Sequence, residues 1–167
     1  MLTKCFVYGT LMSPEVLQAL IGRVPAMCKP AFLPKYTRHP VKGVCYPGII
    51  PVSTENDVSK DGDASSDQIG VEGILLTGLS QEELDKFDWF EAEDYTRSVK
   101  QISVTKILDK PKENGENTIT QMVDANVYIW CCDKELLDLK RDWNYDKFRQ
   151  TKLDWYLKST VRPENGI

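Results

Sequence analysis

Apolar residues come in short runs along the chain, and the first of these runs predict a strand followed by a helix. Residues 4–8 have the length and mainly apolar character of a buried strand, which ends at Gly9. Ser13-Pro14-Glu15 then supplies a helix N-cap, a proline at the first helical position and an acid in the first turn. Gly22 ends the helical spacing that follows. The connection Tyr8–Met12 therefore places backbone N–H groups near a helix N-terminus, where an anion or a carboxylate can bind.

The middle of the chain predicts mainly extended structure. A proline-rich segment indicates extended pieces at 31–36 and 41–46, with a turn at 46–48. Residues 53–68 are polar, and we expect them to form a mobile surface loop. Residues 69–76 then have the pattern of a strand, and their glycines indicate a bend or the close approach of another backbone.

The second half of the chain predicts a capped helix, a pair of strands and a C-terminal helix. Ser80–Glu83 is a capping box, and it opens a short helix that we expect to extend to Asp88. Residues 97–107 and 119–130 alternate as strands on either side of a polar loop, with Val99, Ile102, Val104 and Ile107 as the apolar members of the first strand. Aromatic and apolar residues within 143–158 predict a packing helix. About six strands in mostly antiparallel order, with about three helices, are typical of an α+β fold.

Length and composition favour one globular domain. The chain has 167 residues, of which 41% are hydrophobic and 28% charged, so it is long enough to bury a core and ordinary for a globular protein. We expect a single domain over residues 1–160 and a flexible tail at 161–167. The net charge of −4 argues against a general nucleic-acid surface, and no apolar stretch approaches the length that spans a bilayer.

The five cysteines predict neither a zinc site nor a disulfide framework. Their number is odd, no CxxC spacing occurs, and His39 is the single histidine. The adjacent Cys131 and Cys132 have no redox motif, and His39 has no serine or cysteine motif beside it that would suggest a triad. The first residues lead directly into a strand without the apolar core of a signal peptide. We therefore expect free thiols and a cytoplasmic or nuclear location, with the chain as a monomer or weak homodimer.

Acidic and aromatic side chains alternate between residues 84 and 97, and this run contains the candidate catalyst. The acids are Asp85, Asp88, Glu91, Glu93 and Asp94. An acid held against Trp89, Phe90 and Tyr95 is partly desolvated, and desolvation raises a carboxyl pKa toward the range that suits proton transfer. Glu91 lies directly beside Phe90 and is the carboxylate that we select, with a solvated surface acid as the alternative. We expect the other acids to be solvated or paired with Lys or Arg.

Several motifs occur in the order of a known family. Tyr8-Gly9-Thr10-Leu11 after a buried strand resembles the Tyr-Gly-(Ser/Thr)-(Leu/Asn) signature of the gamma-glutamylcyclotransferase-like superfamily. Residues 87–97 are similar to the Phe-Glu-Gly-x-x-Tyr-x-Arg block of its plant avirulence-induced-gene-like branch. Tyr46-Pro47-Gly48-Ile49, the strand at 71–75 and the strand at 125–130 resemble further elements of that branch.

This resemblance implies a small mixed β-barrel flanked by helices, with one central cavity. In active relatives, the glutamate that matches Glu91 is the catalytic acid/base, and backbone groups of the residues that match Gly9, Thr10 and Leu11 hold the substrate. The substrate is a small γ-glutamyl compound whose α-amine attacks its own γ-carbonyl. The attack expels the attached amine and forms 5-oxoproline. The resemblance implies no metal and no organic cofactor.

Four tyrosines complete the expected substrate-binding set, and packing is the alternative role for Tyr8, Tyr95 and Tyr128. Tyr8 ends the first strand, Tyr46 belongs to the proline-rich segment, and Tyr128 shares one face of its strand with Trp130. Tyr95 is expected to pack or hydrogen-bond beneath the site. Arg97 is expected to form an ion pair with a nearby acid.

Ala92 departs from the family pattern, because the residue after the catalytic glutamate is usually glycine. If this position requires a positive φ, alanine is strained there and Glu91 could be mis-aimed. The alternative is therefore a non-catalytic protein that keeps the cavity for a small molecule or a partner. A third hypothesis is an enzyme of different chemistry in the same cavity. The sequence does not specify the released amine, which would meet the loops at 36–48 and 53–68.

Overall fold

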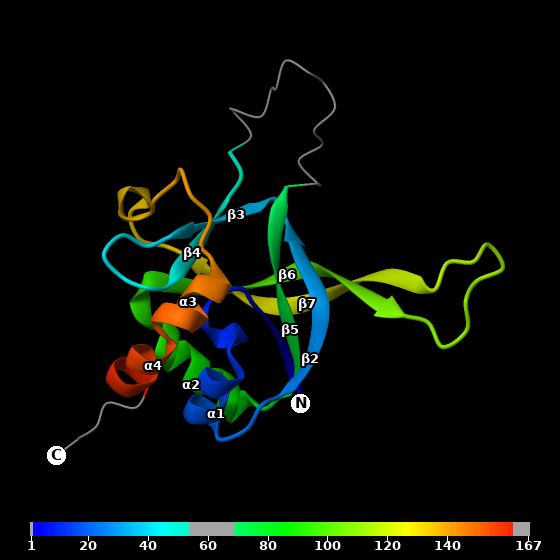
Figure 1. Ribbon diagram of the computed structural model, residues 1–167, viewed down its shortest axis with the longest axis horizontal. Coiled ribbons are helices and arrows are strands. Elements are labelled where there is room, and N and C mark those ends of the chain that lie inside the picture. Colours follow the sequence, from blue (N-terminus) through cyan, green and yellow to red (C-terminus); the bar gives the residue numbers. More distant parts are fainter. Residues whose placement is uncertain (1, 54–68, 162–167) are drawn as a thin grey trace.

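Five strands form a closed barrel at the centre of the molecule (Figure 1). The computed structural model describes residues 2–53 and 69–161 of the chain. Around the barrel the strand order is β1 (Thr3–Val7), β5 (Gly70–Leu79), β2 (Ala26–Pro34), β6 (Tyr95–Ile107) and β7 (Thr118–Trp130). β1 pairs in parallel with β7, and the other neighbours are antiparallel. The predicted α+β fold with a small mixed barrel flanked by helices is confirmed.

A separate ribbon of β3 (Tyr36–Pro40) and β4 (Pro47–Pro51) lies beside the barrel. The predictions for this segment were partly wrong. Residues 41–46 turn between the two strands instead of extending, and Gly43 has a φ of 80° that suits this turn. The turn expected at 46–48 is also absent, because β4 already begins at Pro47. Proline lacks a backbone N–H but is tolerated at the first position of a strand.

The helices gather at one side of the barrel (Figure 1). They are α1 (Pro14–Ile21), α2 (Gln81–Glu91), α3 (Tyr145–Thr151) and α4 (Leu153–Tyr156), with short turns η1 (Thr10–Met12), η3 (Ala92–Asp94), η4 (Lys134–Leu136) and η5 (Leu157–Val161). The Ser13 cap of α1 and the capping box of α2 formed by Ser80 and Glu83 are both present, as predicted. The single helix predicted within 143–158 is divided, because the backbone leaves helical geometry at Lys152.

The predicted end of α2 was three residues short. The helix continues past Asp88 to Glu91, and Ala92 ends it. Leu84 and Phe87 supply the buried face of α2, so tertiary packing supports the last turn even though it is rich in acids. The candidate catalyst is therefore the last helical residue.

Alternate residues along β1 and at Tyr8, which follows it, divide between two apolar clusters, as a two-residue strand period requires. Cys5 and Val7 pack with the helices, whereas Phe6 and Tyr8 pack with residues of the opposite face of the barrel wall. The close backbone approach predicted for β5 occurs at Gly73, where an added Cβ would lie 2.3 Å from the carbonyl oxygen of Val7.

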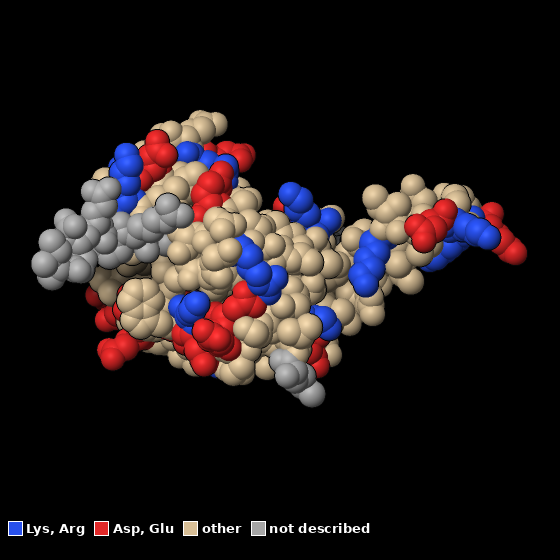
Figure 2. All heavy atoms as spheres, turned by 90° about the horizontal axis from the view of Figure 1, so that it is seen from below, with Lys and Arg blue, Asp and Glu red and all other residues tan. Residues whose placement is uncertain are grey.

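The far ends of β6 and β7 form an arm that projects from the barrel (Figures 1 and 2). Of the apolar members predicted for the first strand of this pair, Val99 and Ile107 are not buried, since they are 61% and 81% exposed. Ile107 lies at the projecting end, where no second layer covers the ribbon, while Ile102 and Val104 are buried as expected. Basic and acidic side chains are interspersed on the face in Figure 2.

Two predicted segments lie largely or wholly outside the described residues. These are the polar loop, described at Ser53 only, and the tail, described at Val161 only. Within the described ranges, no helix is long and apolar enough to cross a membrane.

Candidate functional site

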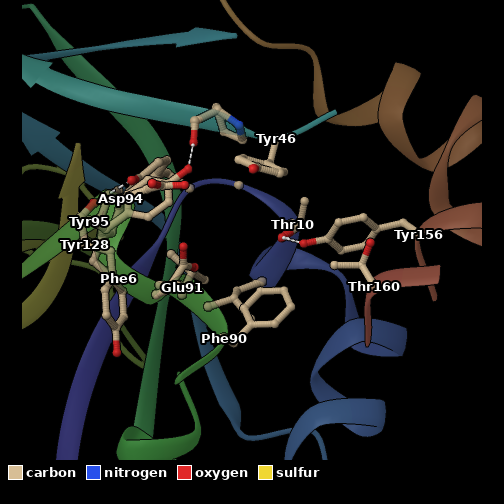
Figure 3. Close-up of a pocket in the computed structure, with 16 residues that line it drawn as sticks. Phe6, Thr10, Tyr46, Phe90, Glu91, Asp94, Tyr95, Tyr128, Tyr156 and Thr160 are labelled. Atoms are coloured by element: carbon tan, nitrogen blue, oxygen red, sulfur yellow. Dashed lines mark hydrogen bonds between the residues drawn. The ribbon is translucent and has the colours of Figure 1, made fainter. Parts of the chain in front are cut away.

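A cavity of about 150 Å³ opens beside the end of α2 and brings the predicted site residues together (Figure 3). All eight of them line it: Tyr8, Gly9, Thr10, Leu11, Tyr46, Glu91, Tyr95 and Tyr128. Further lining residues were not predicted as site residues: Phe6, Val7, Pro47, Phe90, Ala92, Asp94, Tyr156 and Thr160. The location of the predicted set is established, while the role of each member stays a prediction.

One wall of the cavity is the connection between β1 and α1. The chain turns into η1 after Gly9, and the Met12 N–H donates to the Gly9 carbonyl at 3.0 Å. A Cβ at Gly9 would lie 3.0 Å from the Pro47 ring, so the close approach of β4 favours glycine here. Arg38 donates to the Tyr8 carbonyl at 2.8 Å and fixes the start of the connection.

Glu91 enters the cavity from the opposite wall (Figure 3). Burial raises the pKa of its carboxyl to about 8, and no nearby cation among the described residues lowers it. The residue as a whole remains partly accessible, because the cavity is open to solvent. Of its expected aromatic neighbours, Phe90 and Tyr95 line the cavity, but Trp89 is 74% exposed and the prediction that it contributes to the desolvation was wrong.

Asp88 anchors the last turn of α2 to the barrel. Both its carboxylate oxygens accept hydrogen bonds from Arg97, at 2.8 and 3.2 Å, and the Tyr128 hydroxyl donates to it at 2.7 Å. Arg97 also donates to the side chain of Asn126 at 3.0 Å, and Asn126 donates to the Lys4 carbonyl on β1. The predicted ion pairing of Asp88 and Arg97 is confirmed. Because Asp88 is three residues before Glu91, this network fixes the turn that aims Glu91.

The remaining acids of the run differ in their surroundings. Glu93 is exposed, as expected. Asp94 is half-buried and lines the cavity, and its carboxylate accepts a contact of 3.4 Å from the Cys132 thiol. The expectation that Asp94 is solvated or paired with a Lys or Arg was therefore incomplete. The three-residue turn η3 directs it back toward the cavity, and the sequence pattern gave no signal for this.

Three of the tyrosine hydroxyls are already engaged within the protein. Tyr8 donates to the Tyr128 carbonyl, Tyr128 donates to Asp88, and Tyr95 donates to the Pro47 carbonyl at 2.7 Å. Burial raises the pKa of all three, so each stays a neutral hydroxyl. Tyr95 thereby joins β6 to β4 beneath the site, which is the arrangement expected for it.

Two residues of the C-terminal segment also line the cavity. The sequence predicted that Tyr156 packs in a helix, and it did not single out Thr160. Tyr156 is buried on α4, and its hydroxyl lies 3.2 Å from the Thr10 hydroxyl oxygen (Figure 3). Thr160 lies one turn further along the chain and lines the cavity. An apolar helical pattern predicts that Tyr156 is buried, but it does not indicate that the helix meets the β1–α1 connection.

Ala92 has a φ of 56° and a ψ of −155°, a backbone conformation that glycine adopts readily and alanine rarely does. The departure from the family pattern therefore places a Cβ where the backbone turns out of α2. Strain of this kind is worth roughly 1–3 kcal/mol. Glu91 is nevertheless directed into the cavity.

No group of three or more His, Cys, Asp or Glu side chains that could hold a metal ion occurs in the part of the chain that the structure describes. All five cysteines are free thiols. The groups that line the cavity include the Glu91 carboxyl with its raised pKa, the Asp94 carboxylate, hydroxyl groups and the backbone of the β1–α1 connection.

Comparison with protein families identifies the relatives of this chain. A family model described as gamma-glutamyl cyclotransferase, AIG2-like, matches residues 5–147. The chain belongs to this family. An AIG2-like protein D of Arabidopsis thaliana is 31% identical over 155 residues, which cover 93% of this chain and 84% of the relative.

Solved structures support the same assignment of the fold. The solution structure of an Arabidopsis thaliana protein superposes with a TM-score of 0.57 at 25% identity, and the match covers 95% of this chain and 79% of that one. A gamma-glutamyl cyclotransferase specific to glutathione from yeast superposes with a TM-score of 0.51 at 15% identity, covering 84% and 73%. The second likeness concerns the fold alone.

Replacing Ala92 by Gly is expected to raise the free energy of unfolding by about 1 kcal/mol, because glycine adopts a positive φ without a Cβ clash. Urea denaturation at one fixed pH measures the change. Ala19→Gly inside α1 is the matched control and is expected to lower stability by about 1 kcal/mol. Equal losses in the two variants would contradict the strain at Ala92.

The unfolding free energy is expected to fall as the pH rises from about 4.5 to about 8. In that window the folded protein holds a proton on Glu91, whose pKa is about 8, and the unfolded chain has released it. The slope from this group is at most about 1.4 kcal/mol per pH unit. Denaturation curves between about pH 5 and pH 8 measure it, and Glu91→Gln removes it. Parallel pH dependences of the two proteins would show that Glu91 is not desolvated.

Proposed function

We propose that this protein is a gamma-glutamyl cyclotransferase, which converts a small γ-glutamyl amine or peptide to 5-oxoproline and the free amine. The observation that carries the proposal is the placement of Glu91, a carboxyl with a pKa of about 8, across one cavity from the Gly9–Leu11 connection. Membership of the gamma-glutamyl cyclotransferase, AIG2-like family supports it.

Glu91 is the proposed general acid/base. It accepts a proton from the α-ammonium of the substrate, and the freed lone pair forms a bond to the γ-carbon. The amide bond from that carbon to the departing nitrogen then breaks, and Glu91 delivers its proton to this nitrogen. The new ring nitrogen releases a second proton by the same route, so the amine departs as an ammonium ion. One carboxyl with a pKa near neutrality can perform both transfers.

The Gly9–Leu11 connection is the proposed binding loop. Backbone N–H groups that precede the N-terminus of α1 are suited to the substrate α-carboxylate or to the oxyanion that develops on the γ-carbonyl. Tyr8, Tyr46, Tyr95 and Tyr128 are proposed to shape the cavity around the γ-glutamyl unit. The reaction as proposed uses no metal and no organic cofactor. A cytoplasmic or nuclear location is also proposed, and the free thiols are consistent with such a reducing compartment.

A non-catalytic binding protein is the second candidate, and one observation favours it. With a pKa of about 8, Glu91 is mostly protonated at neutral pH in the free protein, and a neutral carboxyl can donate a hydrogen bond to a ligand without reacting. The same cavity would then hold a γ-glutamyl compound or another small molecule unchanged.

Release of 5-oxoproline distinguishes the two candidates. The protein is incubated with γ-glutamyl amino acids, γ-glutamyl-ε-lysine and glutathione, and 5-oxoproline is measured. We expect turnover of at least one substrate, and a loss of about 100-fold or more in kcat for Glu91→Gln, because the general acid/base is removed. Glu93→Gln changes an exposed acid two residues away and is the matched control. Unchanged turnover in Glu91→Gln would refute the mechanism, and no turnover by the wild type would favour the binding protein.

The pH profile of kcat/KM reports the same carboxyl. Only the deprotonated free enzyme accepts the ammonium proton, so kcat/KM is expected to rise about tenfold per pH unit below pH 8 and to level near the Glu91 pKa of about 8. Initial rates at low substrate concentration between about pH 5.5 and pH 9 measure the profile. A constant kcat/KM from pH 6 to pH 8 would exclude Glu91 as the base.

A further inference from the structure

The cavity has two sides, which are built from different parts of the chain. Figure 3 shows Tyr156 and Thr160 on the opposite side of Glu91 from Tyr95 and Tyr128. Tyr95 and Tyr128 come from the barrel strands β6 and β7, whereas Tyr156 and Thr160 come from α4 and η5. The family model ends at residue 147, so Tyr156 and Thr160 lie outside the part of the chain that it matches.

Tyr156 is held rigidly in this second side. Only 3% of it is exposed, and its ring meets Phe90 and Phe148 edge-on, with centroid distances of 6.3 and 5.4 Å. Its hydroxyl lies 3.2 Å from the Thr10 hydroxyl oxygen, so the binding connection positions it as well. Three contacts from three elements therefore fix one aromatic ring at the cavity wall.

The chemistry of this side is apolar and aromatic. Phe90 and Tyr156 adjoin each other at the cavity, and Tyr46 lines it close by (Figure 3). Among the described residues, the charged side chains that line the cavity are Glu91 and Asp94, both acids. An aromatic wall without a cation favours an apolar group over a carboxylate, because a buried carboxylate needs a partner.

We propose that the segment Leu153–Val161 is a specificity-determining wall, at which Tyr156 and Thr160 contact the departing amine of the substrate. The wall selects γ-glutamyl amides whose amine has an apolar body. This inference rests on the proposed function, which places the γ-glutamyl unit between Glu91 and the Gly9–Leu11 connection. With Tyr95 and Tyr128 around the γ-glutamyl unit, the departing group extends to the other side of the cavity, which Tyr156 and Thr160 line. The C-terminal segment would then meet the amine in addition to the loops that the sequence predicts to do so.

Three synthetic substrates test the selectivity of the wild type: γ-glutamyl-phenethylamide, γ-glutamyl-methylamide and γ-glutamyl-glycine. We expect kcat/KM for the phenethylamide to exceed that for each of the other two by roughly tenfold or more, which is the usual effect of a filled apolar subsite. Tyr156→Leu removes the aromatic face and is expected to reduce the preference over the methylamide. Circular dichroism confirms that this variant is folded.

Thr160→Arg tests the position of the wall without disturbing a buried residue, since Thr160 is exposed. A guanidinium there is expected to lower the KM for γ-glutamyl-glycine about fivefold through a partly exposed ion pair, with little change in kcat. Ser159→Arg is the matched control. It adds the same charge one residue earlier, where the side chain bonds to the Trp155 carbonyl and does not line the cavity.

Failure of this inference is distinguishable from failure of the proposed function. If 5-oxoproline forms but Thr160→Arg and Ser159→Arg give the same KM for γ-glutamyl-glycine, the wall is elsewhere and the inference alone is overturned. The inference is also overturned if the wild type does not prefer the phenethylamide. If no substrate yields 5-oxoproline, the proposed function fails and the inference fails with it.

Discussion

The carboxylate of Asp88 is the interaction on which the geometry of the site depends. It joins the last turn of α2 to the barrel through Arg97 on β6 and Tyr128 on β7. Arg97 extends the connection through Asn126 to β1, the strand that leads into the binding connection. The two walls of the cavity are therefore linked through one network. Within it, Arg97 pairs with Asp88, and among the described residues no cation lowers the pKa of Glu91.

Among the described residues no cation pairs with Glu91, and its unpaired carboxyl gives the cavity its distinctive acid–base character. A cation beside Glu91 would hold its carboxyl ionised and lower its pKa, as Arg149 and Arg23 do for Glu15 and Glu83, whose pKa values lie at about 2. Desolvation without compensation instead keeps the pKa of Glu91 at about 8. The strained backbone at Ala92, like the buried carboxyl of Glu91, lowers the stability of the folded protein. It lies where the chain leaves α2 and turns toward β6. The barrel and its network offset both effects.

Local signals predicted the parts of the site that neighbouring residues determine. Ser13 and Ser80 marked the helix starts, and Gly9 marked the connection that the Pro47 ring approaches. Other parts depend on contacts between distant segments, which periodicity does not report. Thr10 meets Tyr156 across 146 positions, and Asp94 lines the cavity only because η3 turns it back. The prediction for Trp89 failed for a different reason: adjacent residues on a helix point to different faces, so Trp89 is exposed although Phe90 lines the cavity.

Under the proposed function, the two sides of the cavity would meet different parts of the substrate. Glu91, its Asp88 network and the Gly9–Leu11 connection all lie within residues 5–147, which match the family model. Tyr156 and Thr160 lie beyond it, on short helical turns that contact the barrel site mainly through Thr10 and Phe90. Substitutions on this segment would alter which amine fits. Because Tyr156 packs on Phe90 beside Glu91, a change at Tyr156 would also alter the burial that sets the pKa of Glu91. Changes at the exposed Thr160 would instead leave the proposed proton-transfer residue in place while the departing groups that fit the cavity change.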